Sequence, residues 1–561
     1  MKARLLFALL LGVFALLTIA DRFAMLELLL LRAGVPLLFA IAQAIAAIGV
    51  GAMLRGSREA DPAVDFLIGL PALGTLFFLA GLVTVSAWTI VPLLVLAAIA
   101  GAVLILAGWK RGETAATSPS PARIAVLLVF LCGVVTALAP PVAIDEIGGT
   151  LAIPRAWALE GRAVELPLLG ASYFPLGLES AALAPASLLG AIHGGVASHL
   201  LHLFAAIAAA IVIQRRTASW LLTAGIVTTP LLALAAGLSL GDWPLIGLMI
   251  VTFAALDRGS DRDDIRTASA ATAAGLLTSY LFVPFALVAW IARRRRPHWV
   301  ALAGVVFFAR NLILTGNPLA PLFGDGTASL FGTRPLALAD YLFHADSLAE
   351  SLGASLVTLS FFAAGVVPAA MAILALGLFF LTPSGRMLAP FLVVAAAGTR
   401  DALKTRWMTA LVALAVLAQT LVVLWVTARG GALGLVTAST STDAFLRAQR
   451  PSYGSIAWLN ETLPAESRTL VVGLGETYWF ARPVRGGGPA DGARISRYLD
   501  VPAAEALRER LRGDGITHVA VFTEESGTTL DPAAQKRLAQ TLDRYAATVT
   551  TRGGVTLFTL R

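Results

Sequence analysis

Apolar runs of roughly 20 residues recur through the first three quarters of the chain, and no other feature constrains its fold as strongly. About 20 apolar residues in a helix cross the hydrocarbon core of a bilayer. Hydrophobic residues make up 58% of the sequence and charged ones 14%, against about 25% charged residues in a soluble domain. The chain is therefore predicted to be a polytopic α-helical membrane protein. The runs lie at roughly 5–20, 34–54, 66–86, 88–108, 124–139, 176–213, 218–239, 243–256, 267–291, 299–315, 352–381, 387–397 and 408–428.

The last part of the chain has a different pattern. Charged residues are about twice as frequent from residue 441 onward as before it. Helical patterns alternate there with short strand patterns, and this alternation is typical of a layered α/β fold. We therefore predict a small soluble α/β domain at 441–561. The expected helices lie at 455–463, 502–513 and 532–546, and the expected strands at 468–474, 516–522 and 554–560.

The apolar part divides at a polar segment. Four apolar runs precede residue 109, and Ser, Pro and Thr are frequent at 110–123. We expect additional N-terminal transmembrane helices in 1–109, a cytoplasmic linker at 110–123 and a transmembrane core at 124–440. The first 20 residues also fit a cleaved signal peptide, but further apolar runs follow at once, which favours an uncleaved first helix.

Loop charges suggest how the chain crosses the membrane. Lysine and arginine collect in cytoplasmic loops of membrane proteins. A long loop at 142–175 and the domain at 441–561 lie on the side of the membrane opposite to the cationic loops. Both are therefore expected on the outer, periplasmic face of a bacterial inner membrane. The run 267–291 has cationic loops at both ends, so a short hairpin fits it better than a single crossing.

Polar residues at the ends of apolar runs are the candidates for function. Asp145 and Glu146 come soon after a run, behind Pro140 and Pro141, where acidic groups are costly and often functional, although a solvated loop would also begin this way. Asp242, in SLGDWPLIGL, either caps a helix or takes part in chemistry. Arg310 ends another run, as an interfacial anchor or as a phosphate ligand.

Several site classes find no support in the sequence. Cys132 is the single cysteine, which excludes disulfides within the chain and cysteine metal clusters. Of the six histidines, His199 and His202 stand three apart on one helix face, and we interpret them as a packing feature. The net charge of +8 belongs to loop cations, so it does not point to nucleic acid.

Three stretches, in this order, resemble GT-C superfamily glycosyltransferases of the bacterial branch related to protein mannosyltransferase and aminoarabinose transferase. The chain departs from that branch at Gly149 and Thr150, where an aromatic residue and a histidine are frequent, and in its extra N-terminal helices. The matching positions are Asp145, Pro154, Arg155, Trp157, Gly161, Arg162, Phe174 and Pro175, then Asp242, then Arg310, Asn311, Thr315, Gly316, Asn317, Pro318 and Pro321.

The resemblance implies a GT-C-like transmembrane core and an inverting hexosyl or pentosyl transfer. The donor would be a polyprenyl-phosphate-linked sugar, and the acceptor a glycan, lipid or protein at the bilayer surface. Asp145 would be the general base, with Glu146 and Asp242 orienting the acceptor or a metal. Substrate binding would fall to Arg310, Arg155 and Asn311. The negative charge on the departing polyprenyl phosphate would be stabilised by Arg310 or, as an alternative, by a divalent cation, Mg or Mn, held by Asp145 and Asp242.

A non-catalytic membrane protein is the alternative: a transporter, a flippase or a scaffold for envelope assembly. Transporters are expected to show internal repeats and charges near the membrane midplane. The sequence has no convincing repeat, and its candidate acids lie at the ends of apolar runs. These features favour the enzyme.

The topology can be tested with reporter fusions. A reporter fused after Arg123 should be cytoplasmic, and one fused after Arg450 should be periplasmic, because cationic loops oppose the C-terminal domain. Activity of a compartment-specific reporter measures each side. Two reporters in the same compartment would contradict the predicted topology.

Overall fold

A computed structural model shows how the apolar runs assemble. It describes residues 32–561 except 57–60, 109–119, 260, 322–355, 357–358, 361–365, 382–384, 399–404, 489–490 and 524–529. The apolar run at 5–20 and most of the linker at 110–123 lie outside the described residues.

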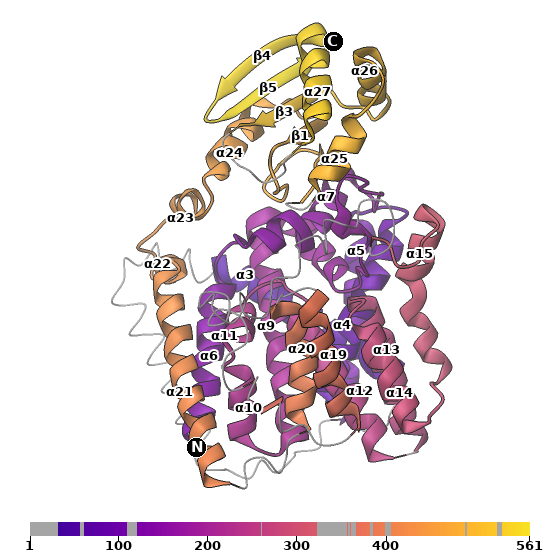
Figure 1. The fold of residues 1–561 in the computed structure, drawn as a ribbon, viewed down its shortest axis with the longest axis vertical. Coiled ribbons are helices and arrows are strands. Elements are labelled where there is room, and N and C mark those ends of the chain that lie inside the picture. Colours follow the sequence, from indigo (N-terminus) through magenta and orange to yellow (C-terminus); the bar gives the residue numbers. More distant parts are fainter. Residues whose placement is uncertain are drawn as a thin grey trace.

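A bundle of helices forms the larger part of the protein (Figure 1). In the described part of the chain, five helices are long and apolar enough to cross a membrane: Arg32–Arg55, Pro62–Gly81, Ala87–Leu106, Gly190–Thr217 and Arg406–Arg429. The polytopic α-helical prediction is thus confirmed. The bundle contains α3 (Val35–Arg55), α4 (Pro62–Gly81), α5 (Ala87–Gly108), α6 (Pro121–Ala137), α9 (Gly190–Thr217), α10 (Trp220–Val227), α11 (Pro230–Ala235), α12 (Asp242–Arg258), α13 (Arg262–Thr278), α14 (Phe282–Arg293), η5 (Trp299–Val305), α15 (Val306–Thr315), α19 (Val366–Leu381), α20 (Gly385–Ala397) and α21 (Arg406–Arg429).

Burial separates the helices at the centre of the bundle from those at its surface. The apolar window of α9 is 83% buried, whereas those of α5 and α21 are 17% and 28% buried. Helix α12 packs on α9 and α13, and nearly all of its side chains are buried. A helix that is apolar all round needs either protein or lipid around it. Helices α5 and α21 therefore present apolar faces that suit lipid.

The structure shows how the two apolar runs 176–213 and 267–291 pass through the bundle. Within 176–213 only short turns precede a single long helix, α9, which ends beside Arg215 and Arg216. The run 267–291 forms two helices, α13 and α14, separated by Ser279–Leu281, as the hairpin prediction expects. Asp257 pairs with both Arg216 and Arg293, so these cationic segments meet at one end of the bundle.

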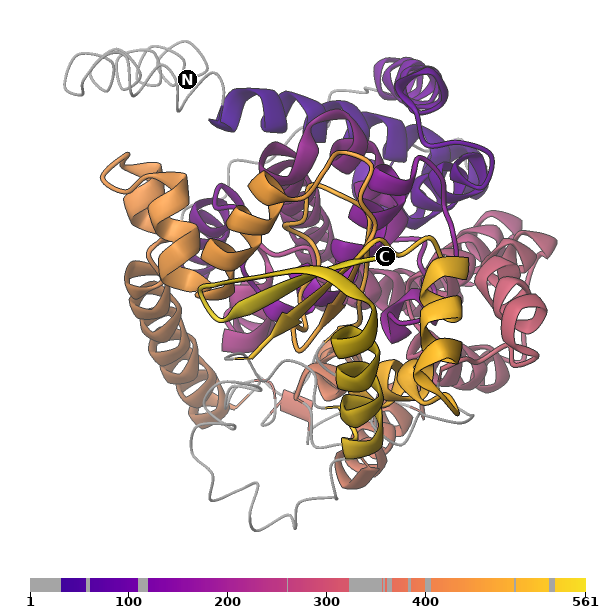
Figure 2. The ribbon, with the colours of Figure 1, turned by 90° about the horizontal axis from the view of Figure 1, so that it is seen from above.

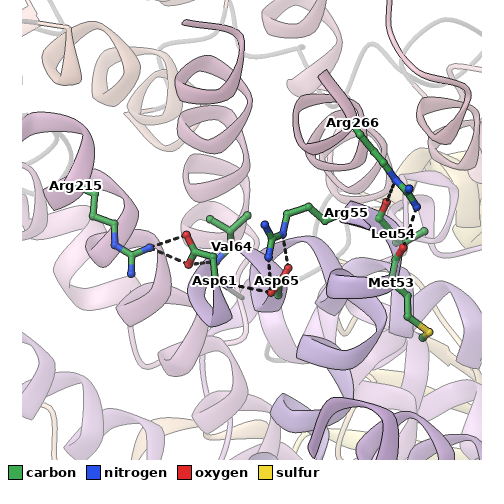
Figure 3. A network of polar contacts seen from close by, with 8 residues as sticks. All are labelled: Met53, Leu54, Arg55, Asp61, Val64, Asp65, Arg215 and Arg266. Atoms are coloured by element: carbon green, nitrogen blue, oxygen red, sulfur yellow. Dashed lines mark hydrogen bonds and ion pairs between the residues drawn. The ribbon is translucent and has the colours of Figure 1, made fainter. Parts of the chain in front are cut away.

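Charged side chains tie the N-terminal helices to the core at that end (Figure 3). Arg55 donates to both carboxylate oxygens of Asp65, at 2.7 and 3.0 Å, and both side chains are buried. Asp61 accepts from Arg215 of α9 at 2.8 Å, and Arg266 of α13 donates to the carbonyl oxygens of Leu54 and Met53. Helices α3 and α4 are therefore anchored to the core by ion pairs as well as by apolar contact.

Close backbone contact also joins α3 to α4. A Cβ atom at Gly69 would lie 1.7 Å from the carbonyl oxygen of Ala47, and one at Gly51 would lie 1.8 Å from that of Asp65. Only glycine permits this approach, because small residues let helix backbones touch in a membrane.

Short elements cover the opposite, outer end of the bundle. Those in 142–175 come from the predicted loop, and those in 179–188 come from the start of the predicted apolar run 176–213. Their irregular turns close that end and carry several of the candidate residues. They are η2 (Glu146–Thr150), α7 (Ala152–Glu160), η3 (Gly170–Tyr173), η4 (Glu179–Ala182) and α8 (Leu183–Leu188).

The C-terminal domain lies above these elements and contains a five-stranded sheet (Figures 1 and 2). Its strand order is β2-β1-β3-β5-β4, with β2, β1 and β3 parallel and the β3–β5 and β5–β4 pairs antiparallel. The strands are β1 (Thr469–Val472), β2 (Val484–Arg485), β3 (His518–Phe522), β4 (Ala546–Arg552) and β5 (Val555–Leu560), and the helices are α22 (Ala432–Val436), α23 (Thr442–Gln449), α24 (Ser452–Thr462), α25 (Gly492–Leu499), α26 (Ala504–Gly513) and α27 (Pro532–Tyr545).

The expected strands and helices of this domain are present, and β2, β4, α23 and α25 are additions, while α22 precedes the predicted boundary at residue 441. Strand β4 is a threonine-rich edge strand whose side chains are mostly exposed, so it lacks the alternation that marks a half-buried strand. Strand β2 has only two residues. Neither leaves a periodic pattern in the sequence.

The domain contacts the outer loop directly. Arg468 donates to Glu160 at 2.6 Å, and the backbone N–H groups of Thr477 and Tyr478 donate to the carbonyl oxygen of Ile147 at 3.0 and 3.1 Å. Arg450 donates to the carbonyl oxygen of Val142 at 2.6 Å. The loop 142–175 and the C-terminal domain therefore lie at the same end of the bundle, and their periplasmic location stays a prediction.

Replacing Asp65 should destabilise the protein. Asp65→Asn leaves the buried guanidinium of Arg55 without its counter-charge, which costs about 3–5 kcal/mol of folding free energy. The midpoint of thermal unfolding in detergent measures the loss. The matched control is Arg215→Ala, which removes the half-exposed pair with Asp61 and should change stability by about 1 kcal/mol or less. Equal shifts of the unfolding midpoint in the two variants would show that the buried Arg55–Asp65 pair stabilises the protein no more than the half-exposed pair does.

Candidate functional site

A cavity of about 480 Å³ lies where the bundle, the outer loop and the C-terminal domain meet. One wall comes from η2 and η3, one from the start of α12 and the end of α13, and one from the C-terminal domain. The titratable residues that line it are Asp145, Glu179, Asp242, Arg386, Asp491 and Arg494. The cavity thus combines four carboxyl groups with two guanidinium groups.

Arg386 joins the two acids that the sequence singled out. Its Nη1 donates to Oδ2 of Asp145 at 2.6 Å, and its Nε lies 3.1 and 2.9 Å from the carboxylate oxygens of Asp242. The Asp145 side chain is 61% exposed and that of Asp242 only 9%. The structure therefore brings Asp145 and Asp242 together in one cavity, with Asp145 the more accessible carboxylate.

Local structure explains the position of each acid. Asp145 directly precedes the π-helical turn η2, and Asp242 is the first residue of α12, after Gly241 at the N-cap. Negative charge is favoured at a helix N-terminus. The N-cap interpretation of Asp242 is thus off by one residue, and its carboxylate bonds to Arg386 rather than to its own helix.

Sequence analysis missed Arg386. It precedes the apolar run 387–397 and lies 144 and 241 positions from its two partners. One signal was available: an arginine directly before an apolar run lies at the end of a predicted membrane segment. Charged groups at such positions are often kept for a partner.

Glu146 points away from the cavity and is fully buried. Its Oε1 accepts from the backbone N–H of Ser239 at 2.5 Å and lies 2.8 Å from Nε2 of His199, whose Nδ1 is 3.0 Å from the carbonyl oxygen of Ala139. Burial alone would raise the pKa of Glu146, but the His199 contact and the Ser239 hydrogen bond lower it below its ordinary value. Glu146 therefore holds η2 against the segment that leads into Asp242.

The histidine interpretation agrees with these contacts. Both ring nitrogens of His199 lie close to oxygen atoms, one of the Glu146 carboxyl group and one of the Ala139 carbonyl group. His202 lies 2.8 Å from the carbonyl oxygen of Ser198 in its own helix. Both side chains are buried in the bundle.

Arg310 and Asn311 support the cavity wall without lining the cavity. Arg310 donates to the carbonyl oxygen of Ser172 at 2.8 Å, with its guanidinium 5.8 Å from the ring centre of Tyr173. Asn311 donates to the carbonyl oxygen of Tyr173 at 2.5 Å and to the hydroxyl of Tyr280 at 2.8 Å. Both residues hold the turn η3 in place, and substrate contact by either stays a prediction.

Arg155 also lies outside the cavity lining. It is partly buried within α7, and its Nε has no hydrogen-bond partner among the described residues. Desolvation lowers the pKa of its guanidinium, and the nearby Tyr478 opposes that shift. Its predicted role in substrate binding is likewise left open by the geometry.

Asp491 connects the C-terminal domain to the cavity wall. Its Oδ1 accepts from the backbone N–H of Gly170 at 3.0 Å, and its Oδ2 accepts from that of Gly488 at 2.7 Å. Burial raises the pKa of Asp491, and these two hydrogen bonds oppose the rise. Arg494 lies over the ring of Tyr173 at 5.2 Å. Neither residue belongs to a motif, so sequence analysis missed both.

The carboxyl group of Glu179 is the fourth acid in the cavity. Its Oε2 is buried and has no hydrogen-bond partner among the described residues. Burial raises the pKa of Glu179 to about 8, a rise that its own backbone hydrogen bond and the charge of Arg386 only partly oppose. Sequence analysis gave this residue no role.

The described residues do not suit a divalent cation. No group of three or more His, Cys, Asp or Glu side chains in the described part of the chain is arranged to hold a metal ion. Between Asp145 and Asp242 lies the guanidinium of Arg386, which already supplies positive charge to both. We therefore derive no step through a metal.

Two solved structures are similar to this chain. They are crystal structures of ArnT from Cupriavidus metallidurans, one bound to undecaprenyl phosphate and one in the apo state, with TM-scores of 0.45 and 0.43. Each shares 16% sequence identity with this chain, and the similarity covers 78% of this chain and 96% of the ArnT chain. No family model matches the chain, and no curated protein matches it. A likeness at this level says nothing about activity.

Asp491→Asn should loosen the contact between the C-terminal domain and the outer loop. An amide nitrogen cannot accept from a backbone N–H, so one of two buried hydrogen bonds is lost, at a cost of about 1–3 kcal/mol. Amide hydrogen exchange at residues 168–174 measures the effect and should become faster. Asp500→Asn, at an exposed position after α25, is the control and should leave that exchange unchanged. Unchanged exchange in both variants would show that Asp491 does not fasten the loop.

Proposed function

We propose that this protein is a membrane glycosyltransferase that moves a sugar from a polyprenyl-phosphate donor to an acceptor hydroxyl at the outer face of a bacterial inner membrane. One observation carries the proposal: Asp145 and Asp242, from separate outer segments, meet Arg386 in the cavity between the bundle and the C-terminal domain. The order of motifs that resemble the GT-C superfamily is independent support.

The place of the cavity suits such a donor. A polyprenyl chain stays in the bilayer, so its phosphate and the anomeric carbon of its sugar lie at the membrane surface. The cavity lies where the helical bundle meets the C-terminal domain, and it is lined by the charged side chains of Asp145, Asp242 and Arg386. The Asp145 side chain is 61% exposed, so an acceptor hydroxyl can reach it from the water side.

Arg386 is the cation best placed to receive the phosphate. A guanidinium group forms paired hydrogen bonds with phosphate oxygens. Its contact with Asp242 is largely shielded from water, whereas its contact with Asp145 is exposed and therefore weaker. An incoming phosphate is expected to replace Asp145 on Arg386, which leaves the Asp145 carboxylate available for chemistry.

The reaction is a single displacement. Asp145 takes the proton of the acceptor hydroxyl, and the acceptor oxygen forms a bond to the anomeric carbon. The bond between that carbon and the phosphate oxygen breaks on the opposite side, and its electron pair leaves with polyprenyl phosphate. Arg386 stabilises the added negative charge. Attack from the side opposite the leaving group inverts the anomeric centre.

The remaining predicted residues act through position in this scheme. Glu146 holds Asp145 and the segment before Asp242 in register through Ser239. Arg310 and Asn311 hold the η3 wall through the carbonyl oxygens of Ser172 and Tyr173. A transporter or flippase is the weaker candidate, because this cavity lies at one end of the bundle instead of near its midplane.

Two variants separate catalysis from donor binding. Asp145→Asn should lower the rate of sugar transfer by at least about a hundredfold, because general-base catalysis contributes roughly 10²–10⁴-fold, while undecaprenyl phosphate still binds. Arg386→Ala should weaken that binding by about 2–4 kcal/mol, through loss of a charge-assisted contact. Transfer assays and lipid-binding titrations on the purified protein measure both. An Asp145→Asn variant with wild-type turnover would rule out Asp145 as the base.

A further inference from the structure

Glu179 occupies a rigid position on the cavity wall. It begins the turn η4, directly after the loop of Phe174 and Pro175 that also lines the cavity. The backbone before it is held by the N–H of Gly177, which donates to the carbonyl oxygen of Leu277 at 2.9 Å. A Cβ atom at Gly177 would lie 2.8 Å from that same oxygen, so α13 and this turn are in close contact. The carboxyl group is therefore presented from a fixed backbone.

One oxygen of this carboxyl group has unused hydrogen-bonding capacity. Both oxygens of Asp242 face Arg386, and both oxygens of Asp491 accept backbone N–H groups. Oε2 of Glu179 is buried with no partner among the described residues. Buried polar atoms in native proteins nearly always have a partner, and exceptions concentrate at functional sites.

We propose that Glu179 is a substrate-binding residue, whose carboxyl group forms a hydrogen bond with a hydroxyl group of the sugar bound in the cavity. This inference rests on the proposed function, since it names the part of the substrate that this wall of the cavity recognises. The terminal torsion of a glutamate side chain is soft, so Oε2 turns toward the cavity without moving the backbone.

A sugar hydroxyl fits Glu179 better than the phosphate does. Arg386 already offers the phosphate a cation, and the phosphate is repelled by Glu179 whenever that carboxyl group is ionised. Because burial raises the pKa of Glu179 to about 8, the group holds a proton at neutral pH, so it can donate as well as accept. A hydroxyl also does both, so the pair forms in either protonation state.

The neighbouring residue is a matched control. Ser180 lies on the same turn, and its hydroxyl is also fully buried with no partner among the described residues. Unlike Glu179, it does not line the cavity. If affinity is lost only because an unpartnered polar atom in η4 is removed, Ser180→Ala should show the same loss. If affinity is lost because a substrate contact is removed, Ser180→Ala should bind as the wild type does.

The experiment compares Glu179→Leu, Glu179→Gln and Ser180→Ala in the full-length protein in lipid nanodiscs. The ligands are undecaprenyl phosphate alone and undecaprenyl phosphate carrying glucose, mannose, galactose or arabinose. Equilibrium binding, KM values for donor and acceptor in the transfer assay, and the midpoint of thermal unfolding are measured for each variant.

Glu179→Leu should bind the sugar-bearing lipid at least tenfold more weakly and bind bare undecaprenyl phosphate as the wild type does. Its unfolding midpoint should be unchanged or higher, because an apolar side chain removes an unpartnered polar group. Glu179→Gln should fall between, since an amide keeps hydrogen bonding to a hydroxyl. Ser180→Ala should match the wild type in every binding measurement.

Each other outcome has a definite meaning. A rise in the KM for the acceptor alone would also support the proposal, with the hydroxyl assigned to the acceptor sugar. Unchanged donor binding and unchanged KM values in Glu179→Leu would overturn it, as would an equal loss of affinity for bare undecaprenyl phosphate. A wild-type protein that binds none of the lipids would overturn the proposed function, and this inference with it, whereas an active wild type with an indifferent Glu179→Leu variant would overturn this inference alone.

Discussion

The ion pairs of Arg386 organise the outer end of this protein. Two carboxylates that were brought close together without a cation would repel each other, and a guanidinium beside apolar helices needs counter-charges. The contacts with Asp145 and Asp242 satisfy both requirements at once. The start of α12, the turn η2 and the start of α20 are thereby fixed around one cavity, on which the proposed chemistry depends.

The two ends of the bundle use charge differently. At the end drawn in Figure 3, Arg55 and Asp65 form a buried pair in which two guanidinium nitrogens donate to the two carboxylate oxygens. At the outer end, the Asp145 side chain remains more than half exposed although it is paired. A buried pair suits anchoring, whereas a pair open to solvent can exchange partners when a charged ligand arrives.

Much of the fold follows from local sequence patterns. The apolar runs predict the helices of the bundle, and the change in charge near residue 441 marks the soluble domain. The hairpin of α13 and α14 follows from cationic loops on both sides of one apolar run. Short elements without a period were missed, such as the edge strand β4, because an exposed strand has no buried face to set an alternation.

The sequence by itself determined the membrane class, the division into bundle and α/β domain, and the choice of Asp145 and Asp242 as candidate residues, because each depends on the polarity of neighbouring residues. Only the tertiary structure decided that Arg386, and not Arg310, lies between these acids. It also decided that Glu146 faces His199 in the interior while Asp145 faces the cavity. Successive side chains on a helical turn point in different directions, and the partner of a charge is set by how distant helices pack. Neither property leaves a signal in the local sequence.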